Sequence, residues 1–121
     1  MNIALWVLQG LLALAFLASG GMKAASTKEK LTADPRMGWA NDFDGSHIRL
    51  IGLSEVLGAI GLVAPWALGI APVLTPIAAA CLCVIMIGAA WTHQRRHEPT
   101  IIPVVLALLT AVVAIGRFRG L

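Results

Sequence analysis

The sequence predicts an all-α integral membrane protein, a four-helix bundle with a long polar loop between its first and second helices. Hydrophobic residues make up 59% of the 121 residues and charged residues 12%, whereas soluble domains are about 45–50% apolar and about 25% charged. The mean hydropathy is +0.86, and a soluble chain of this size could not bury so much apolar surface. We therefore expect residues 1–121 to form one membrane domain.

Four apolar segments approach the roughly 17–25 residues that cross a bilayer, and they are expected to be helices because lipid cannot satisfy backbone polar groups. The first, residues 3–22, has no basic residue before its apolar run. We therefore expect a retained span and not a cleaved signal peptide. It ends Ser19-Gly20-Gly21-Met22-Lys23. The glycines allow close packing, and Lys23 either marks the membrane border or turns inward.

Residues 23–47 form the long polar connector. A loop of this length is usually functional or disordered. Its apolar residues favour a re-entrant or interfacial flap that packs on the bundle; they include Met37, Trp39 and Phe43.

The other three expected helices cover residues 48–64, 73–91 and 101–115. Between the second and third, an uncharged segment framed by Pro65 and Pro72 predicts a tight hairpin turn, with Trp66 as an interfacial anchor. Residues 92–100 form a short polar connector.

The basic residues indicate an orientation and not nucleic-acid binding. Seven of the nine Lys and Arg residues lie in or beside the first and third connectors. Positive-inside reasoning places these two connectors in the cytoplasm and both termini outside. The sequence has no phosphate-binding loop and no haem, flavin or iron–sulfur signature, so no cofactor is evident.

Glu55 is the most informative residue, because it lies inside an apolar run. An ionisable group at that depth costs about 2.5–3.5 kcal/mol and is a functional or assembly hypothesis by default. Gly52, Gly58 and Ala59 lie three or four residues away on the same side, so Glu55 is expected to face helices or a cavity. Two interpretations stay open. One is a structural contact, and the other is a proton relay or an acid in a small-molecule pocket. Candidate partners for the structural contact are Lys23, Arg49 and Gln9.

Other chemistry-bearing residues give weaker signals. His93 and His97 are four residues apart, but a metal site needs further ligands and none is predicted. Cys81 and Cys83 would point to nearly opposite helix faces, so we expect small buried hydrophobes and no disulfide. Arg95 and Arg96 are expected to meet lipid phosphates or to pair with acidic neighbours, namely Asp42, Asp44 or Glu98.

Together, several motifs resemble the DoxX-like family of small bacterial membrane proteins over almost the whole chain. They are Gly21-Met22-Lys23, Trp39 with Asp42-Phe43, the Arg49…Gly52…Glu55…Gly58 helix closing at Pro65, and Thr92-His93-Gln94-Arg95-Arg96. The resemblance implies a four-helix bundle similar in fold to vitamin K epoxide reductase, but without a cysteine pair suited to that chemistry. Family members are linked to thiosulfate–quinone oxidoreduction, quinone handling and oxidative stress.

The resemblance leaves two functions open. The first is an accessory or assembly subunit linked to membrane redox or oxidative-stress handling, in which Glu55 and the small-residue faces bind a partner helix or a second copy. The alternative is an enzyme or binding protein for an apolar ligand, such as a quinone or a lipid, held in a cavity open near the first connector. The expected partners are the lipid bilayer and a homo-oligomer or membrane-protein partner, without nucleic acid. By position, the candidate catalytic residues are Glu55, as acid or base, and His93; the candidate ligand-binding residues are Lys23, Arg49, Glu55, Trp39 and Asp42.

Overall fold

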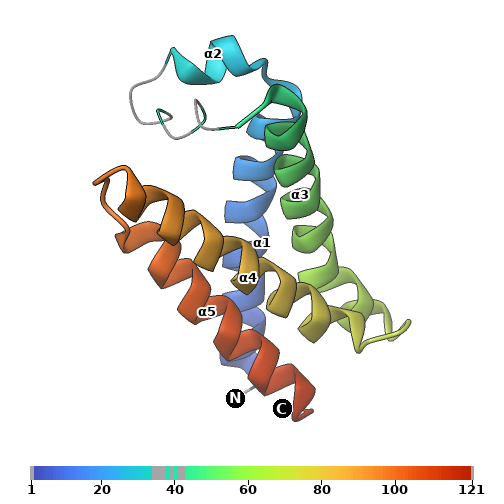
Figure 1. The fold of residues 1–121 in the computed structure, drawn as a ribbon. Helices are drawn as coiled ribbons and strands as arrows, with labels where there is room; N and C mark the ends of the chain where they lie inside the picture. The colour runs from blue at the N-terminus through green and yellow to red at the C-terminus, as the bar shows by residue number, and fades with distance from the viewer. Residues whose placement is uncertain (1, 34–37, 39, 41–42, 121) are drawn as a thin grey trace.

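The structure, a computed structural model, describes residues 2–33, 38, 40 and 43–120. Its helices are α1 (Asn2–Ala25), α2 (Lys28–Thr32), α3 (Gly45–Leu68), α4 (Leu74–Arg95) and α5 (Ile101–Phe118), as Figure 1 shows. Within the described residues, α1, α3, α4 and α5 are long and apolar enough to cross a membrane. The prediction of an all-helical chain with four apolar spans is confirmed.

The bundle consists of two helix pairs, α1 on α3 and α4 on α5, which are joined mainly through α3 and α4. The two chain ends lie at the same end of the bundle, and α2 lies at the other (Figure 1). The core between the pairs is apolar, and many large apolar side chains point outward, as lipid-facing helices require. The core includes Leu12, Phe16, Leu62, Leu82 and Val113.

Two glycines bring α1 and α3 into close contact. A Cβ atom on Gly20 would lie 2.5 Å from the Gly52 carbonyl oxygen, and one on Gly52 would lie 2.7 Å from the Gly20 carbonyl oxygen. Such small residues let membrane helices approach backbone to backbone. Gly52, three residues before Glu55, therefore packs α3 on α1 of the same chain.

Helix α3 continues past Pro65, the residue at which the sequence predicted the start of a turn. α3 continues to Leu68 and ends at Gly69, whose φ of 67° is left-handed. Proline cannot donate a backbone hydrogen bond to the carbonyl four residues earlier, which is that of Gly61. The Thr75 hydroxyl donates to this carbonyl instead, at 2.8 Å. A side chain of α4 thus compensates for the proline, and the turn is confined to the residues after Leu68.

Thr75→Val is expected to cost about 0.5–1.5 kcal/mol in the free energy of unfolding, because the Gly61 carbonyl loses its donor. Pro65→Ala supplies a backbone N–H for the same carbonyl. In that background the cost of Thr75→Val should shrink. Unfolding of the four variants in detergent–SDS mixtures measures the difference, and an unchanged cost in both backgrounds would contradict this role for Thr75.

The described part of the predicted polar connector packs on the start of α3. α1 extends beyond Met22 to Ala25, and α2 follows with Thr27 as its N-cap, which accepts a hydrogen bond from the Lys30 backbone nitrogen at 3.2 Å. Leu31 and Ala40 are buried against Ile48 of α3, with Phe43 beside them. Three connector residues named from the sequence lie outside the described part of the chain, namely Met37, Trp39 and Asp42.

Candidate functional site

A buried ion pair joins the first two long helices. The Lys23 ammonium, in the last turn of α1, lies 2.5 Å from the Glu55 Oε1 atom of α3. The Glu55 side chain is 1% exposed and that of Lys23 is 11% exposed. Lys23 also donates to the Ser19 hydroxyl at 3.0 Å. Of the three partners that the sequence offered to Glu55, the structure selects Lys23.

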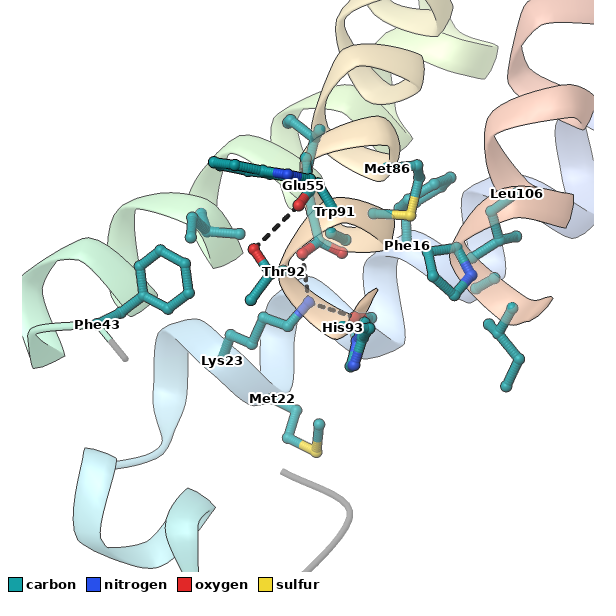
Figure 2. Close-up of a pocket in the computed structure, with 18 of the residues that line it drawn as sticks. Phe16, Met22, Lys23, Phe43, Glu55, Met86, Trp91, Thr92, His93 and Leu106 are labelled. Carbon is teal, nitrogen blue, oxygen red and sulfur yellow. Dashed lines mark hydrogen bonds and ion pairs between the residues drawn. The ribbon is translucent and has the colours of Figure 1, made fainter. Parts of the chain in front are cut away.

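The pair stands at the wall of a cavity of about 560 Å³. Figure 2 shows Lys23, Glu55 and His93 at its polar side, with Phe16, Met86 and Leu106 among the apolar residues. The lining comes from all four long helices and from Phe43. Because Phe43 belongs to the connector between α1 and α3, and Met22 and Lys23 lie in the last turns of α1, the cavity lies toward that connector. Its further lining includes Ile51, Ile85, Trp91, Thr92, Arg95, Ile102 and Pro103.

The Glu55 carboxylate is only half satisfied. Its Oε1 atom accepts the Lys23 hydrogen bond, whereas its buried Oε2 atom has no hydrogen-bond partner among the described residues. A buried polar atom without a partner costs about 1–3 kcal/mol, and more when it is charged. The carboxylate therefore retains acceptor capacity beside an apolar cavity.

The rim of the cavity contains a second set of charged groups. His93 Nδ1 lies 2.9 Å from Glu98 Oε1, and Arg96 Nε lies 3.4 Å from Glu98 Oε2. Burial raises the pKa of the Glu98 carboxyl, but hydrogen bonds from His93 and Arg96 and the charges of these residues outweigh burial, so its pKa lies below the ordinary 4.5. Arg95 stacks over Trp91, with its guanidinium carbon 5.0 Å from the ring centroid. These contacts hold the connector that follows α4 against the end of that helix.

Acidification is expected to release this connector. The pKa of Glu98 is lowered in the folded protein, so its contacts contribute stability above the ordinary pKa and lose it as the pH falls through the lowered value. Glu98→Gln should be less stable than the wild type near neutral pH, and the difference should shrink as the pH falls below the ordinary pKa of 4.5 and vanish below the lowered pKa. Unfolding or limited proteolysis across that range measures it, and a difference independent of pH would contradict the ion-pair role.

A family model described as the DoxX-like family matches residues 7–115. The chain belongs to the DoxX-like family. Neither the curated proteins nor the solved structures gave a match. The resemblance stated from the sequence is thus confirmed, and the apolar helices of this DoxX-like protein make it a multi-pass membrane protein.

The structure of this DoxX-like protein brings together three of the predicted site residues, Lys23, Glu55 and His93, around the cavity. Arg49 lies on the exposed side of α3 and does not line the cavity. It is six residues before Glu55, and with 3.6 residues per turn the two side chains point in different directions. The other two predicted residues, Trp39 and Asp42, lie outside the described residues.

Among the residues that the structure describes, the remaining polar candidates do not form a further site. α4 ends at Arg95, and His97 lies beyond it with a left-handed φ of 56°, so His93 and His97 do not share a helix face. Within the described ranges, no cluster of three or more His, Cys, Asp and Glu residues could hold a metal ion. Both cysteines are free, and Cys81 is exposed on α4, contrary to the expected burial, because its side of the helix faces outward.

The sequence did not reveal a buried arginine at the other end of the bundle. Arg117, one of the two basic residues away from the first and third connectors, is 2% exposed. Its Nε donates to Gln9 Oε1 at 2.8 Å, its Nη1 donates to Asn2 Oδ1 at 2.9 Å, and its guanidinium lies 4.6 Å from the centre of the Trp66 ring. The available signal was Gln9, a polar residue within the apolar α1 that requires a polar partner. This cluster ties α5 to α1 and lies outside the cavity.

Proposed function

We propose that this DoxX-like protein binds an apolar membrane molecule with a small polar head, such as a quinone, in the cavity among its four long helices. The supporting observation is that the apolar cavity ends at the Lys23–Glu55 ion pair. In a bundle without a ligand site, close-packed apolar side chains would be expected at this position. Ligand sites are typically apolar clefts of about 300–1,000 Å³ with a few polar groups that orient the ligand. The volume and the lining both fit that description.

Each polar residue has a role in this proposal. Glu55 meets the polar head and serves as the acid or base that exchanges a proton with it. Lys23 compensates the carboxylate charge and keeps it in place through the contact at 2.5 Å. His93, held by Glu98, is the second candidate for proton exchange, at the rim.

Filling the cavity should weaken binding. Gly88 lines the cavity, and a Cβ atom added there would meet nothing within 4 Å, so a leucine can enter without a backbone clash. Gly10 of α1 is equally open but lies outside this cavity, which makes Gly10→Leu a matched control. We expect a short-chain quinone to quench the tryptophan fluorescence, to which Trp91 in the cavity lining contributes, in a saturable way in the wild type and in Gly10→Leu. Gly88→Leu should weaken that binding at least about tenfold.

The proposal fails if no quinone or quinol probe binds saturably to the wild type, or if Gly88→Leu binds as well as Gly10→Leu. The first result would indicate a cavity without a ligand of this class. The second would place binding elsewhere on the protein.

An accessory or assembly role in membrane redox or oxidative-stress handling, which the family resemblance implies, is the second candidate. Because Gly20 and Gly52 pack closely within the chain, α1 already covers the face of α3 that contains Glu55. A partner or a second copy would therefore dock on the outer helix faces. The likeness to the vitamin K epoxide reductase arrangement also remains a prediction. The positive-inside rule supports an orientation with the cavity toward the cytoplasm and both termini outside.

A further inference from the structure

We propose that the cavity selects molecules whose polar head donates a hydrogen bond from a hydroxyl group to Glu55. The proposal rests on the function proposed above and narrows its ligand class. Within quinone-type molecules it favours the reduced, hydroxyl-bearing form over the oxidised form, whose carbonyl groups only accept. A phenol and an alcohol on an apolar chain share the required chemistry.

The first support is the state of the carboxylate. Oε1 is engaged by the Lys23 ammonium at 2.5 Å, and Oε2 has no hydrogen-bond partner among the described residues. A carboxylate paired with an ammonium can only accept hydrogen bonds. The Oε2 atom therefore needs a hydrogen-bond donor to be satisfied.

The second support is the make-up of the cavity wall, in which the polar side chains besides Glu55 are Ser19, Lys23, Thr92, His93 and Arg95, and none of these bonds Glu55 Oε2. Phe16, Ile85 and Met86 line the cavity with apolar side chains. The Thr92 hydroxyl, which also lines it, donates to the Gly88 carbonyl at 3.0 Å. A donor from a ligand would satisfy Oε2 after rotation about the last side-chain bond of Glu55, which is a soft torsion.

The third support is the cost of the wrong head group. A carbonyl or ether oxygen presents lone pairs to Oε2 and leaves it unsatisfied, whereas a hydroxyl forms a charge-assisted hydrogen bond, about twice as strong as a neutral one. Sites that hold buried polar groups reject analogues that cannot pair with them. We expect a preference of about tenfold or more for the hydroxyl form.

The test compares matched probes on the full-length wild-type protein in detergent micelles, with tryptophan fluorescence as the readout. One set is a decyl hydroquinone, its dimethyl ether and the oxidised quinone. The other is a prenyl alcohol and its methyl ether, which distinguishes an aliphatic from a phenolic source of the hydroxyl. The expected result in at least one set is that the hydroxyl form binds about tenfold tighter than the ether.

Glu55→Gln provides the second readout, since the amide can turn its NH₂ group toward the ligand while its oxygen keeps the Lys23 contact. The preference should then invert toward the oxidised quinone. Equal binding of the hydroxyl and ether forms to the wild type, within about twofold, overturns the inference and leaves the proposed function standing. Absence of binding by every probe overturns both. The wild-type series decides the matter even if the variant does not fold.

Discussion

Replacing Lys23 with methionine is expected to lower the free energy of unfolding by about 3–5 kcal/mol, the range for breaking a buried ion pair by removing one partner. Methionine keeps the length of the side chain but not its charge. The Glu55 carboxylate, 1% exposed, would then lose the ammonium 2.5 Å away. The loss is read from unfolding in detergent–SDS mixtures.

The double variant Lys23→Met/Glu55→Leu separates charge from packing. With both charges removed, no uncompensated group remains, so the double variant should be more stable than Lys23→Met alone. A Lys23→Met variant as stable as the wild type would contradict the buried pair. So would a double variant whose loss equals the sum of the two single losses.

Gly20→Ala is expected to destabilise the bundle by about 1–3 kcal/mol, the usual range for overpacking. The added Cβ would lie 2.5 Å from the Gly52 carbonyl oxygen and 2.8 Å from the Glu55 Cβ. These neighbours are a backbone atom of α3 and the first side-chain carbon of Glu55, so neither can move aside without a shift of the helix. The α1–α3 contact must open, which pulls Lys23 away from Glu55, so probe binding should weaken as well.

The neighbouring glycine gives a matched control. A Cβ on Gly21 would meet nothing within 4 Å, and the higher helix propensity of alanine is worth up to about 1 kcal/mol. Gly21→Ala should therefore equal or exceed the wild type in stability and keep its binding. Similar losses in both variants would show that general helix effects and not close packing govern this part of α1.

The sequence was sufficient for the class of fold and for the central residue, for physical reasons. The cost of a charge in lipid singles out Glu55, and the glycine three residues earlier indicates its inward direction. The pairing with Lys23 was one of three alternatives, because sequence spacing within one helix says nothing of which residue on another helix lies opposite. The register of α1 against α3, set by Gly20 and Gly52, decides it.

Other features depended on tertiary contacts that the sequence pattern does not contain. Arg49 shares the helix and the charge expected of a ligand-binding residue, but its helical position turns it away from Glu55. Pro65 is a turn signal that α3 accommodates because Thr75 satisfies the freed carbonyl. In the sequence Arg117 resembles an ordinary charge near a terminus, whereas in the structure its guanidinium contacts Gln9 and Trp66.

We propose that a ligand in the cavity places its polar head on the Glu55 carboxylate. Infrared difference spectroscopy tests this most directly, by recording the carboxylate stretching bands on addition of a decyl hydroquinone and assigning them with Glu55→Gln. We expect a saturable shift of the Glu55 carboxylate band that follows the binding curve and is absent in Glu55→Gln. Saturable binding with no change in that band would contradict it.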